Sequence, residues 1–359
     1  MITTNNIFSL IQLAEASYTL FDLSGYVTDE QARAGLTDKD SFKGEFSNFQ
    51  ASIFVSQWNV AHHQRNTVSG FSATLFASKE NPGEVVLAIR GTEPFVQAGR
   101  DLSVDIGDIV LDGLALYQII DLYNYWQYLS APAGVAYAAA RFVDFNPLQH
   151  SLDDAIIDLP SGRIMTIERG SSTSFFAGTD RALALGAASS VTKVTVTGHS
   201  LGGHLAAAFT RLFPSTGADA VLANGAGFVT THPNVDRVFR LLNGTTAFDA
   251  GRITNVFANR GPEIVAQDWY LQQGGGRHPV FSETAIGYTF GHGVGQITDS
   301  LAVYDLFIKL SSQIRNSTPA AALATLKPLF EAASAQAESS LKTPKGSGLE
   351  ISVFGMSPI

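Results

Sequence analysis

The sequence predicts an α/β fold with a mainly parallel central sheet, flanking helices and one lid-like insertion. Three observations carry this prediction. Strand-like and helix-like segments alternate along the chain. A buried strand-like run at 84–90 ends in the sharp breaker Gly91-Thr-Glu-Pro94. In segment 191–212, alternating Val, Thr and Lys residues lead into a Gly-rich turn and then a small, apolar, helix-like stretch. Ligands of such sheets bind at the carboxyl ends of the strands.

Composition limits the classes of partner and of chemistry. The chain has 359 residues, of which 45% are hydrophobic, enough for one large domain or one domain with a small appendage. Its formal net charge of −9 makes nucleic acid an unsuitable partner, so any lipid contact should use apolar patches. There are no cysteines, which excludes disulfides, thiolate metal sites and cysteine nucleophiles.

The N-terminus carries no basic region followed by a long apolar stretch, and no window of about 18 residues is both apolar and uncharged. We therefore expect neither a signal peptide nor a membrane span. A place outside the cell, reached without an N-terminal signal, is favoured over the cytoplasm.

In the first third of the chain, the residue pattern predicts helices followed by an antiparallel hairpin at one sheet edge. The expected elements are a helix at 7–23, a short helix at 28–36, mixed loop and strand at 46–60, a strand at 69–77, a turn at 79–83 and a strand at 84–90. In the first helix, the expected inward positions are Ile11, Leu13, Ala14 and Tyr18.

In the rest of the chain, the residue pattern predicts further alternation of helices and strands, followed by an Ala-rich tail of different composition. The expected elements are a helix at 114–129, an irregular stretch at 132–169, a helix at 179–188 with Thr179 as N-cap, strands at 191–197, 219–222 and 252–258, and helices at 205–212 and 297–310. The tail should form an Ala-rich helix at 318–341, a flexible linker at 342–348 and a final strand at 350–354.

The run Gly198-His-Ser200-Leu-Gly202 has the form G-x-S-x-G between a predicted strand and a predicted helix. That context predicts a nucleophile elbow, in which Ser200 lies on a strained turn with its hydroxyl exposed. Glycines at both ends leave room for strand and helix to approach closely. The alternative is an ordinary Gly-rich turn, but the flanking elements and the additional Gly203 favour the elbow.

A serine hydroxyl needs a general base, usually a histidine. In proteins with such an elbow the chain order is serine, acid, histidine, and the base should follow the last strand. His292 fits this place because glycines flank it and the predicted helix at 297–310 follows. His278 is held in reserve, and either residue could instead be an ordinary surface histidine.

The acid that orients the base should follow the strand predicted at 252–258. Glu263 is the first carboxylate after it, Asp268 is the second choice, and Asp249, before the strand, is the third. The alternative for Glu263 is a solvated carboxylate or a partner of Arg260.

Acyl transfer also needs hydrogen-bond donors for the developing oxyanion. One candidate is the backbone N–H of Leu201, directly after the serine. The second is Thr92, directly after the strand at 84–90, whose hydroxyl could add a further donor. The alternative is that Gly91-Thr92 forms an ordinary β-turn.

Two motifs together resemble a known family. Val86-Leu-Ala-Ile-Arg-Gly-Thr92 with Val196-Thr-Gly-His-Ser-Leu-Gly-Gly203 looks like the class 3 lipases, nearest to their bacterial lipase and phospholipase A1-like branch, from about 71 to 310. The resemblance implies an α/β-hydrolase fold, esterase chemistry on lipids, and Ser200 and His292 in their usual roles. The family commonly places an aspartate where this chain has Glu263 after an inserted Pro262.

The expected organisation is an α/β-hydrolase catalytic domain at 1–315 and a tail at 316–359. Class 3 lipases carry a lid in the region corresponding to 113–170, and the alternative for this stretch is a core helix with an Ω-loop. Four acidic residues repeat just before it, namely Asp101, Asp105, Asp108 and Asp112. Carboxylates of this kind can bind calcium, but a solvated helix face with capping roles is favoured, and no cofactor is required.

We therefore expect a serine hydrolase of lipid esters, of the triacylglycerol lipase or phospholipase A1 type, that works through a Ser-Glu/Asp-His triad and an acyl-enzyme. Its partners would be lipid or small-molecule esters, with transient contact to a membrane or lipid surface. Two alternatives are an inactive lipid- or partner-binding module on the same fold and a peptidase or amidase with the same triad.

Overall fold

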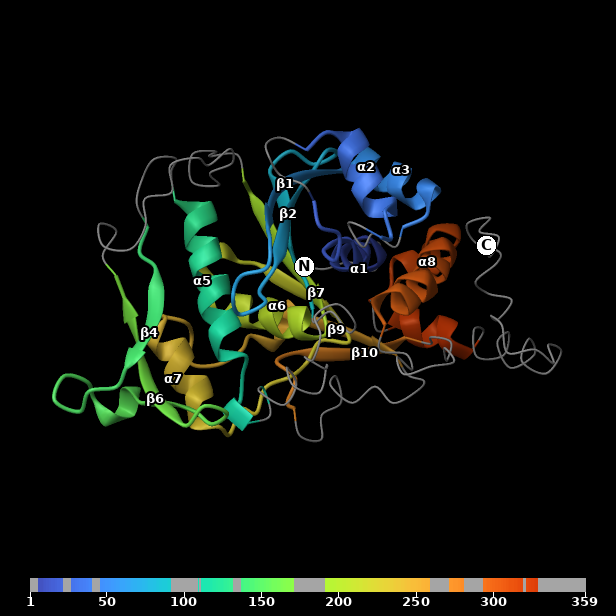
Figure 1. The fold of residues 1–359 in the computed structure, drawn as a ribbon. Helices are drawn as coiled ribbons and strands as arrows, with labels where there is room; N and C mark the ends of the chain where they lie inside the picture. The colour runs from blue at the N-terminus through green and yellow to red at the C-terminus, as the bar shows by residue number, and fades with distance from the viewer. Residues whose placement is uncertain are drawn as a thin grey trace.

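The central element is a seven-stranded sheet that confirms the predicted α/β class (Figure 1). The chain is represented by a computed structural model that describes residues 6–21, 27–40, 46–91, 109, 111–131, 137–170, 191–258, 271–280, 293–318 and 321–328. In spatial order, the strands are β1 (Trp58–Gln64), β2 (Ala73–Ser78), β3 (Glu84–Ile89), β7 (Lys193–His199), β8 (Asp219–Ala223), β9 (Ile253–Ala258) and β10 (Gly276–Val280). The strand β2 runs antiparallel to both neighbours, and the pairs from β3 to β10 are parallel. The expected antiparallel hairpin forms between β2 and β3. It does not lie at the sheet edge as predicted, because β1 pairs with β2 on its outer side.

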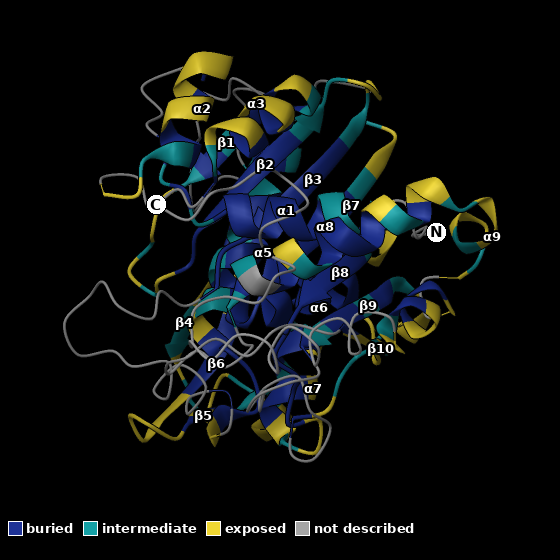
Figure 2. Ribbon diagram, turned by 90° about the vertical axis from the view of Figure 1, so that its right-hand side faces the viewer, coloured by how far each residue is buried: buried dark blue, intermediate teal, exposed yellow. Residues whose placement is uncertain are grey.

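Helices cover both faces of this sheet because the strand side chains alternate between two cores (Figure 2). Leu87 of β3 belongs to the core with α5 (Leu116–Ser130) and α6 (Leu201–Leu212). Its neighbours Val86 and Ala88 belong to the core with α1 (Ile7–Ala16) and α8 (Val294–Leu310). The helices α2 (Asp29–Thr37) and α3 (Asn48–Gln57) add side chains to this second core.

A second, smaller sheet lies beside α5, where the sequence predicted no regular element. Its strands are β4 (Ala140–Asp144), β6 (Arg163–Arg169) and β5 (Ile156–Asp158), in that spatial order and antiparallel. The side chain of Asn124 in α5 bonds both the N–H (2.7 Å) and the C=O (2.9 Å) of Ala140. β5 has only three residues, and buried and exposed positions do not alternate regularly in β4 or β6, so none of the three shows a clear strand period in the sequence.

The helix α7 (Pro233–Leu241) borders the free edge of β5. The Asn234 side chain accepts a hydrogen bond from the Ile157 N–H (3.2 Å) and donates one to the Ile157 C=O (2.7 Å). An edge strand is thereby given partners for its backbone groups.

Several expected elements end or begin at other residues than predicted. The helix α1 ends at Ala16 rather than at 23. Segment 48–57 is the helix α3 rather than loop and strand, because Ser47 and Gln50 form a capping box that starts it. Of the expected inward positions in the first segment, Ile11, Leu13 and Ala14 are fully buried, whereas Tyr18 lies beyond the helix and is partly exposed.

The short helix 321–328, within the predicted tail, packs against the core around α1 and α8 through Ala322, Leu323 and Leu326. The boundary at 315 stays a prediction. The helix expected at 179–188, the linker at 342–348 and the strand at 350–354 lie outside the described residues. Within the described part of the chain, no helix combines the length and apolar character needed to cross a membrane.

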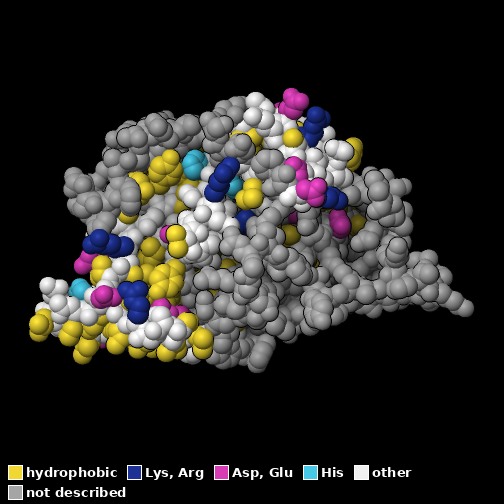
Figure 3. Space-filling view, viewed as in Figure 1, with side chains coloured by type: hydrophobic (Ala, Val, Ile, Leu, Met, Phe, Trp, Pro, Cys, Tyr) yellow, Lys and Arg dark blue, Asp and Glu magenta, His cyan; other side chains and the backbone are white. Residues whose placement is uncertain are grey.

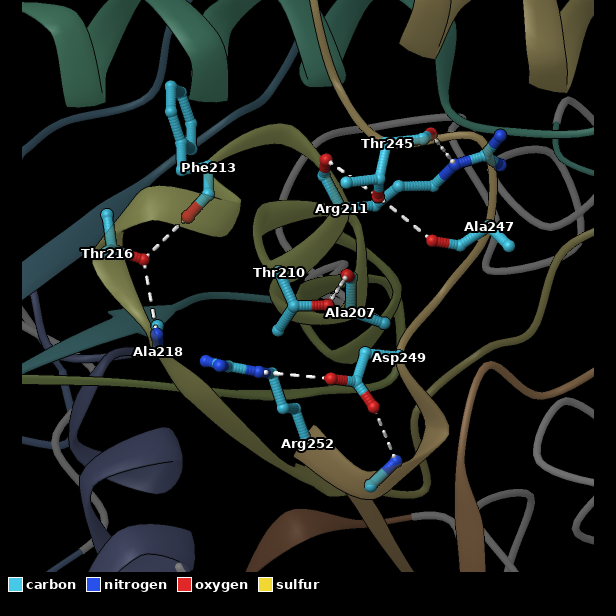
Figure 4. A network of polar contacts seen from close by, with 11 residues as sticks. Ala207, Thr210, Arg211, Phe213, Thr216, Ala218, Thr245, Ala247, Asp249 and Arg252 are labelled. Carbon is cyan, nitrogen blue, oxygen red and sulfur yellow. Dashed lines mark hydrogen bonds and ion pairs between the residues drawn. The ribbon is translucent and has the colours of Figure 1, made fainter.

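The C-terminal end of α6 is held by a buried arginine (Figure 4). Arg211 donates hydrogen bonds to the carbonyl oxygens of Thr245 (2.8 Å) and Thr246 (2.7 Å) and to the Asp236 carboxylate (2.7 Å). Its guanidinium also lies 4.1 Å from the centre of the Phe239 ring. These contacts attach the segment that leads into β9 to the end of α6.

We expect Arg211→Met to lower the free energy of unfolding by about 2–4 kcal/mol, because it removes three hydrogen bonds made by a buried guanidinium. Arg252→Met is the matched control, since the Arg252 bond to Asp249 is largely exposed and its loss should cost about 1 kcal/mol or less. Denaturant titration measures both changes. Equal losses in the two variants would contradict this role for Arg211.

Candidate active site

Ser200 lies on a strained turn between β7 and α6. Its backbone angles are φ 55° and ψ −120°, in the region that residues other than glycine rarely adopt. The Ser200 N–H donates to the Ala223 C=O (3.0 Å), and the Ser200 C=O accepts from the N–H groups of His204 (3.1 Å) and Ala226 (3.0 Å). A conformation of this kind costs about 1–3 kcal/mol and persists only where the surroundings hold it in place.

The two glycines of the motif are required by close backbone approach. A Cβ on Gly198 would lie 2.3 Å from the carbonyl carbon and oxygen of Gly202. A Cβ on Gly202 would lie 2.1 Å from the Ile89 carbonyl oxygen at the end of β3. Both distances are shorter than any real Cβ contact, so strand, turn and helix can meet in this way only with glycine at both places. The strained turn between strand and helix predicted from the sequence is therefore confirmed. The predicted exposure of the serine is wrong, because Ser200 is only 1% exposed.

The end of β3 reaches the same place. A Cβ on Gly91 would lie 2.4 Å from the His199 carbonyl oxygen, so the chain passes directly beside the turn as it leaves β3. Leu201, the first predicted oxyanion donor, is the first residue of α6. Thr92, the second predicted donor, lies just outside the described residues.

His199 contacts a residue that sequence reasoning did not connect with the site. The Tyr18 hydroxyl and His199 Nδ1 are 2.8 Å apart. The same hydroxyl oxygen lies 2.5 Å from the position of a Cβ on Gly91. Tyr18, His199 and Gly91 thus meet beside the turn, although nothing in the sequence pairs residues so far apart.

His204 is a structural residue of the site. Its ring is fully buried and stacks on Phe228 with the ring centres 3.9 Å apart. Nδ1 donates to the Gly227 C=O (2.9 Å), and Nε2 accepts from the Ala115 N–H (3.2 Å). One nitrogen must donate and the other accept, so the ring is neutral. Burial lowers the pKa of His204 from 6.5 to about 4.

Two buried asparagines hold the carboxyl end of β9. The Asn224 side chain accepts from the Ala258 N–H (2.9 Å). The Asn255 side chain bonds the Gly225 N–H (3.0 Å) and C=O (2.9 Å), and it donates to the Gln273 side chain (2.7 Å). The run Asn224-Gly-Ala-Gly227 is typical of a loop, but the sequence does not reveal which groups these asparagines bond.

The chain that follows segment 259–270 is also held in place by backbone hydrogen bonds. Phe228 and Gln272 exchange two backbone hydrogen bonds, of 2.9 Å and 2.8 Å. Both ends of the segment that carries the candidate acids are therefore attached to the loop that follows β8. Glu263 and Asp268 themselves lie outside the described residues, as does His292.

The reserve base His278 and the third candidate acid Asp249 both lie within the described residues. His278, expected in a loop, lies in β10 opposite Val256 of β9, where the strand pattern was too short and too polar to predict. It is half-buried, and burial lowers its pKa. Asp249 caps the turn before β9 and bonds Gly251 N–H and Arg252 (Figure 4). β9 and β7 both run parallel to β8. Asp249 precedes β9 and so lies at the amino ends of these strands, whereas Ser200 follows β7 at their carboxyl ends. This separation rules out the third choice of acid.

The acidic group before α5 is described only at Asp112. This residue is buried, and its carboxylate accepts a hydrogen bond from the Leu159 N–H (2.8 Å), so it is not part of a solvated helix face. Asp101, Asp105 and Asp108 lie outside the described residues. Among the residues that are described, no group of three or more His, Asp or Glu side chains could hold a metal ion.

The sheet order and the turn at Ser200 together define the architecture. The chain has an α/β-hydrolase fold. Nothing matches this chain among protein-family models or among curated proteins.

Solved structures of fungal and yeast lipases are similar to the chain at a low level. The Lip2 lipase of Yarrowia lipolytica is 15% identical, with a TM-score of 0.37, over 80% of this chain and 82% of that one. Lipase II from Rhizopus niveus is 13% identical, with a TM-score of 0.34, over 79% and 83%. The lipase of Rhizopus microsporus var. chinensis is 12% identical, with a TM-score of 0.31, over 74% and 69%. With TM-scores below 0.5, the fold assignment depends on the topology and the turn described above.

The neutral state of His204 predicts a loss of stability in acid. In the unfolded chain this histidine takes up a proton near pH 6.5, whereas in the folded protein it does so only near pH 4. The free energy of unfolding should therefore fall as the pH is lowered from 6.5 to 4, by about 3 kcal/mol from this residue alone. Denaturant titrations across this range should show a smaller fall for His204→Gln than for the wild type. Identical falls in the two proteins would contradict the assignment.

Proposed function

We propose that this protein is a serine carboxylic-ester hydrolase of the class 3 lipase type that acts on lipid esters. The observation that supports this best is the backbone of Ser200, with φ 55° and ψ −120° between β7 and α6. In α/β-hydrolase folds a turn of this kind presents the nucleophile at the carboxyl end of the sheet. A strained conformation at an ordinary surface serine would have nothing to maintain it.

In the proposed reaction, Ser200 attacks the ester carbonyl carbon while His292 takes the serine proton. His292 then donates this proton to the leaving alcohol, and the acyl group stays on Ser200. A water molecule that His292 deprotonates attacks the acyl-enzyme, releases the fatty acid and restores the serine. Glu263 orients the imidazole, with Asp268 as the alternative, and the oxyanion is bound by the Leu201 N–H and by Thr92.

The lipid-ester substrate is inferred from the paired motifs at 86–92 and 196–203, which resemble the class 3 lipases and especially their bacterial branch. The close approach of Gly91 to His199 supports this pairing, because it brings the ends of both motifs to one place. Triacylglycerol and phospholipid remain the two substrate classes of the proposal. Rates on short- to long-chain acyl esters, with phospholipid alongside, distinguish them.

We propose that a lid function of segment 113–170 is confined to the parts outside α5. Eight residues of α5 are buried, and the helix begins at the Ala115–His204 hydrogen bond one turn from Ser200. Moving α5 would expose this core to water and break that bond.

The first test is Ser200→Ala on a chromogenic fatty-acyl ester. We expect the wild type to hydrolyse it and the variant to lose at least about 10³-fold in kcat, because no nucleophile remains. Ser56→Ala, an exposed serine in α3, is the matched control and should keep full activity. A fluorophosphonate probe should label the wild type at Ser200. Equal rates for wild type and Ser200→Ala would contradict the proposal.

The second test compares Glu263→Ala with Asp268→Ala. Loss of the orienting carboxylate should lower kcat by about 10²- to 10⁴-fold, because the imidazole loses its preferred tautomer and the stabilisation of its charge. We expect this loss for Glu263→Ala and a change of less than about threefold for Asp268→Ala. The opposite pattern would assign the acid to Asp268.

A further inference from the structure

Exposed apolar side chains are concentrated in one short part of the described chain. Of twelve large hydrophobic residues that the described part exposes, five lie within 148–164. They are Leu148 (93% exposed), Leu152 (73%), Ile157 (41%), Leu159 (51%) and Ile164 (52%), and we call them the 148–164 patch. Figure 3 shows apolar side chains gathered at the lower left, over the small sheet of Figure 1. Clusters of this kind on a folded protein mark interaction surfaces.

Packing of the small sheet does not account for the patch. Ile156 of β5 and Met165 of β6 are paired and fully buried on the side that faces α5. Ile157 and Ile164 are the next pair in the register, so their side chains lie on the opposite face. Leu148, Leu152 and Leu159 lie in the turns and the short 3-10 helix around β5. The buried face supplies the core contacts of the small sheet, whereas Ile157 and Ile164 on the other face stay 41% and 52% exposed.

The charges around the patch cancel one another. Arg163 pairs with Asp144 (2.7 Å), Arg240 with Asp154 (2.7 Å) and Arg141 with Glu168 (3.3 Å). Each of these three arginines therefore has a carboxylate beside it, in a chain whose net charge is −9. An anionic surface would be repelled by such a protein, whereas an uncharged or zwitterionic surface would not.

The patch is joined to the serine turn by three hydrogen bonds. The Tyr117 hydroxyl donates to Asp158 (2.7 Å), in the strand that carries Ile157. Two residues before Tyr117, the Ala115 N–H donates to the ring Nε2 of His204 (3.2 Å). The backbone N–H of His204 in turn donates to the Ser200 C=O (3.1 Å). A surface bound at the patch would therefore be held in a fixed relation to Ser200.

We propose that the 148–164 patch docks the protein on an uncharged or zwitterionic lipid surface, with the leucines of its turns entering the interfacial layer. The small sheet projects from the body of the molecule at the side away from α8 (Figure 1), so its turns form a convex tip. A fluid lipid layer accommodates isolated leucine side chains on such a tip, whereas a protein partner would need a matching groove. This docking goes beyond the ester hydrolysis proposed above and does not require it.

The test uses the full chain with Ser200→Ala, so that no turnover alters the lipid. Sedimentation with phosphatidylcholine vesicles measures the partition coefficient. We expect the double variant Leu148→Ser/Leu152→Ser to lower this coefficient by about tenfold or more, because two apolar side chains no longer leave water. The matched control is Leu306→Ser/Leu310→Ser, a pair of exposed leucines on α8, which should change binding by less than about twofold.

A single variant, Leu148→Trp, keeps the apolar character and should show a blue-shifted fluorescence increment when vesicles are added. Three results would overturn the proposal. They are unchanged vesicle binding in Leu148→Ser/Leu152→Ser, binding only to phosphatidylglycerol vesicles with loss at high salt, and a wild-type dimer that this double variant converts to a monomer. Because Ser200→Ala binds without turnover, failure of the hydrolase proposal and failure of docking are seen separately.

Discussion

The close approach of α6 to the ends of β3 and β7 is the constraint on which the rest of the structure depends. Gly202 lies against the Ile89 carbonyl and Gly198 against Gly202, so even one methyl group at either position would force these elements apart. This contact tightens the chain at Ser200 into its positive-φ turn. It also brings the chain leaving β3, with Gly91, beside the turn. A sheet order that placed any other strand next to β7 on that side would not bring the two motifs together.

Buried polar groups then secure the loops around this contact. His204 bonds the start of α5 and the loop after β8 through opposite ring nitrogens, while Arg211 attaches the other end of α6 to the segment before β9. Both ends of α6 are thus fixed by buried polar side chains that bond neighbouring backbone groups and, for Arg211, the Asp236 carboxylate. Buried polar networks of this kind hold a single arrangement, because breaking one bond leaves its partner unsolvated.

The sequence predicted most of the sheet and the serine turn because their signals are local. Alternation identifies β3 and β7, and the glycine spacing identifies the turn. The missed elements lacked such signals. β5 has three residues, β4 and β6 do not alternate, and β10 reads Gly-Arg-His-Pro-Val. The helix α3 depends on the Ser47–Gln50 capping box rather than on an apolar period. The partners Tyr18 and Asn255 were missed for another reason. Their contacts depend on how distant segments fold together, and polarity alone does not reveal them.

The attachment of both ends of segment 259–270 has a consequence for how such a protein can vary. Asn224 holds the chain where it leaves β9, and the Phe228–Gln272 pair holds it where it returns. When two anchors are fixed by the scaffold, doubling the length of the connection between them costs only about 0.6 kcal/mol. The segment can therefore gain or lose residues, such as Pro262, while its anchors keep their places. Spacing along the sequence is therefore a poor guide to which carboxylate of this segment serves the site.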